Sequence, residues 1–87
     1  MENKVRRKIL SEMKFEAEKM VISLEVNLEA FDMAIKTEKD KPKKGKSEVE
    51  ESAGNITRLN EELRKNTSLR NNTMVILEIT NKKLGDL

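Results

Sequence analysis

The sequence lacks cysteine, histidine, tryptophan and tyrosine, and its only aromatic residues are two phenylalanines. Without cysteine there is no disulfide framework and no thiol nucleophile. Without histidine, the commonest general base is missing, and the Glu-x-x-His metal sites of helical bundles are excluded. Gly45, Gly54 and Gly85 are isolated, so no glycine-rich phosphate-binding loop is present. The sequence therefore predicts a protein that is not an enzyme and that binds no cofactor and no metal.

Long apolar runs are missing as well. No stretch of about 18 apolar residues could span a membrane, and the start MENKVRRKIL lacks the apolar core of a signal peptide. We therefore expect an intracellular protein of the cytoplasm or the nucleus. The 87 residues are 39% charged and 36% hydrophobic, which leaves little material for a core. Abundant Glu, Lys, Leu and Met with a single proline favours long helices within one small domain.

Residues 1–40 are predicted to form the first helix. Their apolar residues recur at alternating spacings of three and four, the pattern of a helix packed lengthwise against another. The expected hairpin seam, meaning the line of side chains between the two helices, consists here of Leu10, Met13, Ala17, Met20, Leu24 and Phe31. A second apolar stripe lies beside it and is expected to face a partner chain; it consists of Val21, Leu28 and Ile35.

Residues 41–47 are predicted to form a linker, and residues 48–87 a second helix. Pro42 disfavours helical geometry at Lys41, and Gly45 loosens the backbone further. Ser47, followed three residues later by Glu50, has the spacing of a capping box that would begin the second helix.

The linker also carries the positive charge of the chain. Residues 1–40 and 47–87 each have a net charge of −1, whereas the linker has four lysines and no acid, which are Lys41, Lys43, Lys44 and Lys46. The favoured interpretation is a solvated turn. One alternative is a nuclear-import signal of the K-K-x-K type. The other is contact with an acidic partner, nucleic acid or a membrane surface.

The second helix has a less regular hairpin seam. Its apolar and charged members are Ile56, Leu59, Leu63, Arg70, Leu77 and Leu84, and polar residues occupy the positions between them. Polar residues at such positions cost stability but can determine register and partner choice. Residues 73–79 differ, because apolar side chains point all round the helix. We expect a partner surface there, with a β-strand as the alternative, formed by Met74, Val75, Ile76 and Ile79.

A fold back at the linker brings residues whose numbers add up to about 87 face to face. Leu24 would then meet Leu63, and Asn27 would meet Asn60. The predicted fold is all-α: an antiparallel two-helix coiled-coil hairpin, completed to a multi-helix bundle by oligomerisation or by partner chains.

The predicted function is a non-enzymatic coiled-coil interaction or scaffold subunit in a larger intracellular complex. It would assemble with itself, with a dimer favoured, or with other helical chains. A nucleic-acid-binding hairpin dimer is one alternative, but it needs a basic stripe, and only Arg6, Arg7, Lys8 and the linker lysines offer one. A membrane-tethering or fusion module is the other, and the sequence shows no anchor for it.

Overall fold

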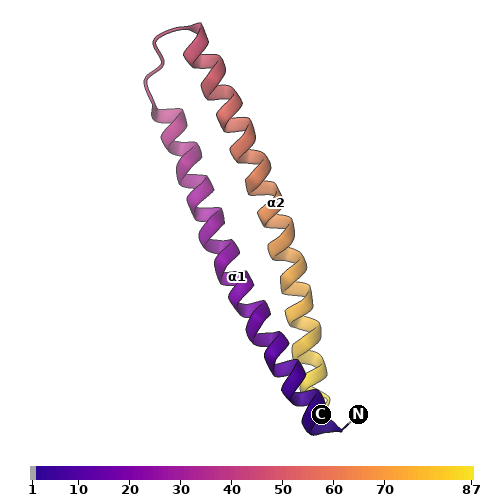
Figure 1. The fold of residues 1–87 in the computed structure, drawn as a ribbon. Coiled ribbons are helices and arrows are strands. Elements are labelled where there is room, and N and C mark those ends of the chain that lie inside the picture. Colours follow the sequence, from indigo (N-terminus) through magenta and orange to yellow (C-terminus); the bar gives the residue numbers. More distant parts are fainter. Residues whose placement is uncertain (1) are drawn as a thin grey trace.

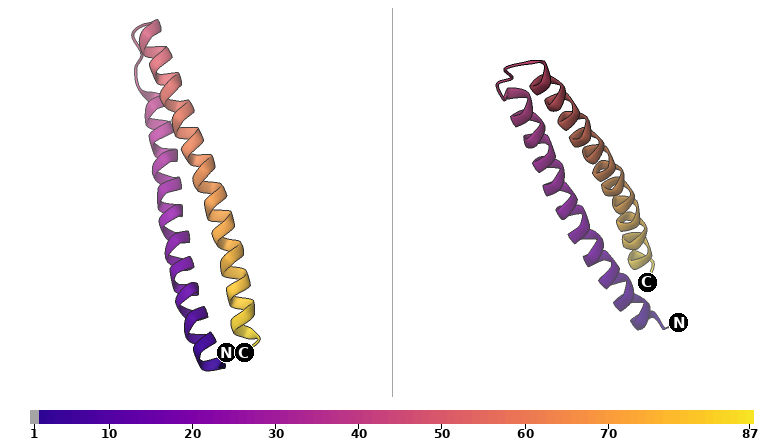
Figure 2. Two further views of the ribbon diagram at one scale, coloured as in Figure 1. Left: turned by 45° about the vertical axis from the view of Figure 1, so that its right-hand side comes forward. Right: turned by 45° about the horizontal axis from the view of Figure 1, so that its top comes forward.

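The computed structural model describes residues 2–87 and consists of two long α-helices joined by a short loop. Helix α1 spans Asn3–Asp40 and helix α2 spans Lys46–Gly85. The helices run antiparallel side by side, so the two termini lie together at one end and the loop at the other (Figures 1 and 2). The Cα atoms extend 67 Å along the rod and 14 Å across it. The prediction of an all-helical hairpin is confirmed, and residues 73–79 are helical.

Helix α1 continues for 38 residues because no proline or glycine interrupts it. It ends at Asp40, and the next residue, Lys41, is extended with φ −66° and ψ 131°. Lys41 precedes Pro42, whose ring excludes the helical conformation from the residue before it. The proline therefore ends α1 where the sequence predicts.

Helix α2 begins at Lys46, two residues earlier than expected, and without the predicted capping box. Ser47 lies inside the first turn, and no side chain caps the helix at Gly45. Instead, the Glu48 carboxylate accepts a hydrogen bond of 2.6 Å from the backbone N–H of Lys44. An acid at this position also suits the positive end of the helix dipole.

The hairpin seam is narrow and partly polar. The buried apolar side chains, all in α1, are Leu10, Ala17, Val21, Leu24 and Ile35, and the buried polar ones, all in α2, are Ser52, Thr73 and Thr80. The two threonine hydroxyls donate to carbonyl oxygens of their own helix, at 2.8 Å and 2.7 Å. Because the hydroxyls are satisfied locally, the threonines bring no unpaired polar group into the contact. The most buried side chains that α2 contributes to the seam are thus small and polar.

The face that α1 turns toward α2 differs in part from the predicted one, although Leu10, Ala17 and Leu24 are buried as assigned. Val21 and Ile35 were assigned to a partner-facing stripe, but they are buried in the hairpin, and Leu28 is half-buried beside them. Met13 and Met20 were assigned to the seam, yet 47% and 46% of their surfaces are exposed. Burying branched aliphatic side chains costs about 0.5–1 kcal/mol of side-chain entropy each, whereas methionine costs about 1.5–2 kcal/mol. This difference favours the observed rotation of α1.

The remaining assigned seam residues are buried or half-buried. Phe31 in α1 is half-buried. In α2 the same holds for Ile56, Leu59, Leu63, Arg70, Leu77 and Leu84. The face that α2 turns toward α1 is therefore the one assigned from its sequence.

The register is shifted by about one heptad from the predicted alignment. Asn27 contacts Asn66, rather than Asn60, and residues in contact across the hairpin have numbers that add up to 90–95. A shift of seven residues leaves the same side chains facing inward, so periodicity alone does not distinguish the two alignments. In Figure 1 the loop continues beyond the end of α1 before α2 begins, which accommodates the shift.

The seam predicts unequal costs for two leucine truncations. Leu24 is 4% exposed, so Leu24→Ala is expected to destabilise the chain by about 2–5 kcal/mol. Leu69 is about half exposed, so Leu69→Ala is expected to cost about 1 kcal/mol or less. Urea unfolding followed by circular dichroism at one low protein concentration measures both. Equal losses would contradict the assignment of Leu24 to the core.

Candidate interaction surfaces and the loop between the helices

Most of the large apolar side chains lie outside the hairpin seam. Among residues 2–87, fourteen of them are exposed, whereas the buried apolar residues are four large ones and an alanine, and the other large apolar side chains are half-buried. Single exposed apolar residues are ordinary on a protein surface, but contiguous groups of them mark interaction sites. Two such groups stand out here, one on each helix.

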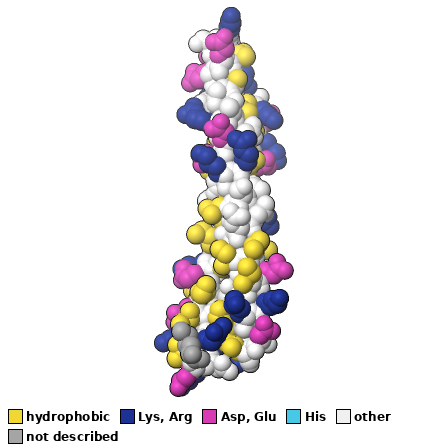
Figure 3. All heavy atoms as spheres, turned by 90° about the vertical axis from the view of Figure 1, so that its right-hand side faces the viewer, with side chains coloured by type: hydrophobic (Ala, Val, Ile, Leu, Met, Phe, Trp, Pro, Cys, Tyr) yellow, Lys and Arg dark blue, Asp and Glu magenta, His cyan; other side chains and the backbone are white. Residues whose placement is uncertain are grey.

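The first group, the α2 patch, covers the half of α2 nearer the termini. It comprises Leu69, Met74, Val75, Ile76 and Ile79, whose exposed fractions are 43–53%. Figure 3 shows apolar side chains gathered over this half of the face formed by α2. A shallow hollow on the patch is lined by Met74, Val75, Leu77, Glu78 and Asn81. The residues of the predicted partner surface on α2 are thus all exposed, and they point to several sides of the helix, while Leu77 turns toward α1.

The second group, the outer α1 stripe, was not anticipated from the sequence. It comprises Phe15, Ile22, Val26 and Met33, the four most exposed large apolar side chains, at 60–68%. They are spaced by seven, four and seven residues, so they share one face of α1. Ile22 and Val26 are each two positions from the buried Leu24, which places the stripe on the side facing away from α2. The seven-residue spacings among these apolar residues are the feature of the sequence from which the stripe could have been predicted.

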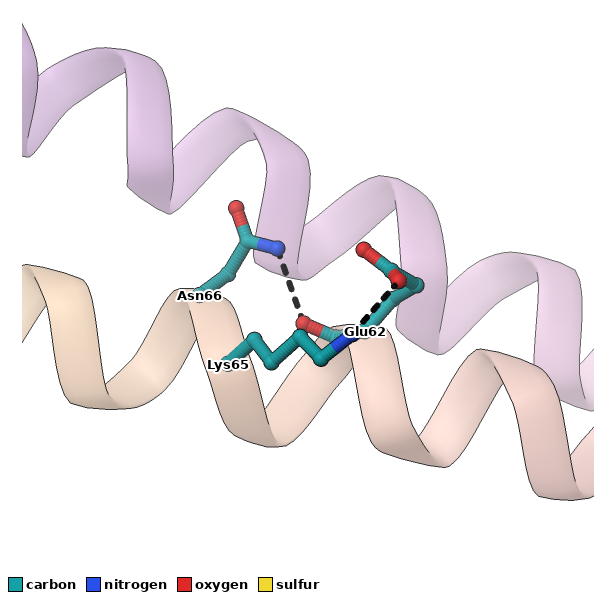
Figure 4. A network of polar contacts seen from close by, with 3 residues as sticks. All are labelled: Glu62, Lys65 and Asn66. Carbon is teal, nitrogen blue, oxygen red and sulfur yellow. Dashed lines mark hydrogen bonds and ion pairs between the residues drawn. The ribbon is translucent and has the colours of Figure 1, made fainter.

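Polar side chains occupy the middle of the hairpin. The Asn27 amide donates to Asn66 Oδ1 at 3.4 Å. The Asn66 amide in turn donates to the Glu62 carbonyl oxygen at 2.8 Å, as Figure 4 shows. Arg70 Nε is buried without a hydrogen bond, 3.7 Å from Glu25 Oε1. These pairs specify which residues of the two helices lie opposite each other. The Lys65–Glu62 ion pair beside them is exposed to solvent (Figure 4).

One of the four linker lysines caps α1. The Lys43 ammonium donates to the carbonyl oxygens of Glu38, Lys39 and Lys41 at 2.9, 3.1 and 2.9 Å. All three of its N–H donors are used, and its charge lies at the negative end of the α1 dipole. Lys41, Lys44 and Lys46 are exposed, whereas Lys43 is half-buried. Lys43 therefore has a structural role that the interpretation as a solvated turn did not include.

Glu38, the last half-buried residue of α1, connects this cap to α2. The Ser52 hydroxyl donates to its backbone carbonyl oxygen at 3.5 Å, and the Asn55 amide donates to its Oε1 at 3.4 Å. Ser52 and Asn55 lower the pKa of the Glu38 carboxyl below its usual 4.5; desolvation opposes them in part, and the charges of Lys41 and Lys43 add a smaller lowering.

The same loop residues line a pocket of about 410 Å³, formed by Glu38, Lys41, Pro42, Lys43, Lys44, Glu48, Glu51, Ser52 and Asn55. Acidic and basic groups alternate around it, so it presents no single charge to a ligand. Among residues 2–87 no acidic side chains gather in a group that could hold a metal ion. The pocket thus belongs to the structure of the turn.

Comparisons with protein-family models, curated proteins and solved structures found no significant match to this chain. In the described part of the chain, neither helix has an apolar stretch long enough to cross a membrane.

The cap predicts different effects for two neighbouring lysines. Lys43→Gln removes the ammonium from the end of α1 and is expected to destabilise the chain by about 0.5–1.5 kcal/mol. Lys44→Gln changes an exposed side chain and is expected to cost less than about 0.5 kcal/mol. Urea unfolding of both variants measures the difference, and an equal effect would remove the cap as an explanation.

Glu38 predicts a pH dependence that Asn55 controls. Because its pKa is lowered in the folded chain, its stabilising contribution is present above 4.5 and is lost as the pH falls through the folded pKa. Asn55→Ala removes the hydrogen bond to Glu38 Oε1 and is expected to raise the Glu38 pKa toward its usual value, while Asn60→Ala, at an exposed position of α2, leaves it unchanged. Carboxyl chemical shifts followed by NMR during acid titration report both, and an unmoved pKa in Asn55→Ala would contradict the assignment.

Proposed function

We propose that this chain is a non-enzymatic helical interaction subunit that works by packing its exposed helix faces against further helices, in the manner of a coiled coil. Its partners are a second copy of the chain or other helical chains of an intracellular complex. The observation that carries the proposal is the excess of large apolar side chains outside the hairpin seam over those inside it. A structure of two helices has no way to cover these faces internally.

The small core supports the same proposal. Chains shorter than about 70–80 residues rarely form a core that stabilises them alone, and oligomerisation is one of the usual remedies. At 87 residues, with no large apolar side chain of α2 fully buried, this chain is close to that limit. Helices packed on the α2 patch or on the outer α1 stripe would add buried apolar area without any change of fold.

The distribution of polar groups supports interaction over catalysis. The sequence has no histidine or cysteine, and the Arg70–Glu25 and Asn27–Asn66 pairs join the two helices rather than converge on a cavity. Lys41, Lys44 and Lys46 are exposed and remain available for nuclear import or for an acidic partner. We therefore retain cytoplasm or nucleus as the proposed location.

Association in solution tests the proposed function. The purified chain is expected to be strongly helical and to sediment above its monomer mass of 10.0 kDa, with a melting temperature that rises with protein concentration. Sedimentation and thermal melting between about 1 µM and about 100 µM measure this. A compact monomer that melts cooperatively at a temperature independent of concentration would contradict the proposal.

A further inference from the structure

The outer α1 stripe has a pattern that reads the same in both directions. Phe15 and Met33 lie equally far from residue 24, and so do Ile22 and Val26. Two copies of α1 that cross antiparallel at this level would bring Phe15 of one copy against Met33 of the other. Ile22 would likewise lie against Val26 of the second copy, so apolar side chains meet along the whole stripe.

Charged residues continue the same stripe in both directions. Together with the apolar residues they occupy ten positions at alternating spacings of four and three, all of them exposed. The charged members that share the midpoint at residue 24 form three pairs of opposite sign, which are Lys19 with Glu29, Glu12 with Lys36, and Lys8 with Asp40. In a parallel arrangement each of these residues would meet its own like charge. Charge complementarity therefore selects the antiparallel arrangement.

We propose that two copies of this chain form a twofold-symmetric antiparallel dimer through the outer α1 stripe, with the two α1 helices inside and the two α2 helices outside. This rests on the proposed function and names the partner and the surface. An interface of this kind uses the same patch on both copies, as twofold symmetry requires.

The dimensions are sufficient for a specific contact. The stripe from Lys8 to Asp40 spans 33 residues, or about 50 Å along the helix, and a helix face is about 10 Å wide. Two such faces bury roughly 1,000 Å² in total, near the lower limit for a specific interface. The dimer is therefore of moderate affinity and dissociates on dilution.

The acids beside the stripe are already neutralised in part. Asp32 Oδ2 lies 3.2 Å from Lys36 Nζ of the same helix, and Glu25 lies 3.7 Å from Arg70 of α2. The side chains of Lys36 and Asp32 are 72% and 56% exposed, so their pair is weak and can rearrange to admit Glu12 of the second copy. Glu25 is held toward α2 by Arg70, which reduces repulsion where the two α1 helices cross.

The first experiment compares two matched double variants by sedimentation. Ile22→Lys with Val26→Lys is expected to make the chain monomeric, because both substitutions place charge at the centre of the dimer. Val75→Lys with Ile79→Lys adds the same charge to the α2 patch and is expected to leave the dimer intact. Circular dichroism on the same samples checks that both variants keep their helix content.

The outcomes separate this inference from the proposed function. If the α2 variant dissociates and the stripe variant does not, association is real and the outer α1 stripe is not its surface. If the unmodified chain is a monomer at every concentration, both the stripe dimer and self-assembly are overturned.

Cross-linking tests whether the two α1 helices of the dimer run antiparallel. Because the sequence has no natural cysteine, only the introduced cysteines can form a disulfide. Lys19→Cys and Glu29→Cys, mixed and oxidised, are expected to give a disulfide between the two variants. Neither variant alone is expected to cross-link, because ten residues, or about 15 Å, separate like positions in the antiparallel dimer, whereas a disulfide needs Cα atoms about 4.4–6.8 Å apart. Cross-linking of each variant with itself would show a parallel arrangement and overturn the proposal.

Charge reversal provides the rescue. Lys19→Glu or Glu29→Lys alone is expected to weaken the dimer roughly tenfold, since two opposite-charge pairs become like-charge pairs. The two substitutions together restore the opposite-charge pairs and are expected to return the dissociation constant to that of the unmodified chain. If the double variant instead dimerises more weakly than either single variant, the predicted pairing of Lys19 with Glu29 is overturned.

Discussion

A helix packed against one neighbour can bury only one stripe of its surface, and this geometric limit governs the whole molecule. Helices α1 and α2 each have a single neighbour, yet both carry apolar residues over more than one face. The hairpin seam takes Val21, Leu24 and Ile35, and the other apolar faces remain exposed. The shape of the fold and its capacity to associate are therefore consequences of the same limit.

Periodicity in the sequence was sufficient to predict two long helices, the turn at Pro42 and the inward face of α2. It was insufficient for the rotation of α1, because two adjacent apolar stripes have the same heptad spacing, and packing decided between Val21 and Met20. Periodicity was also insufficient to predict the register, since a shift of one helix by a heptad leaves the same residues facing inward. Asn27 pairs with Asn66 in the observed register, and polar contacts of this kind depend on geometry that spacing does not encode.

The loop shows why charge alone gave an incomplete interpretation. Four lysines within six residues suggested one basic feature, but the structure divides them by geometry. Lys43 folds back onto the carbonyl oxygens that α1 leaves unpaired, and the others extend into solvent. The last carbonyl oxygens of any helix lack hydrogen-bond donors within the helix. Proline ends α1 next to Lys43, so this one lysine supplies the donors and has a role that its neighbours lack.

The antiparallel hairpin also acts as a spacer. Both termini lie at one end of the rod and the loop lies at the other (Figure 1). The Cα atoms of the rod extend over 67 Å. Anything joined to either terminus is held at nearly the full length of the rod from anything that contacts the exposed loop lysines. Because both helices run side by side over most of this distance, bending the rod would require deforming two helices at once. The separation is therefore set by helix length and is largely independent of what occupies the ends.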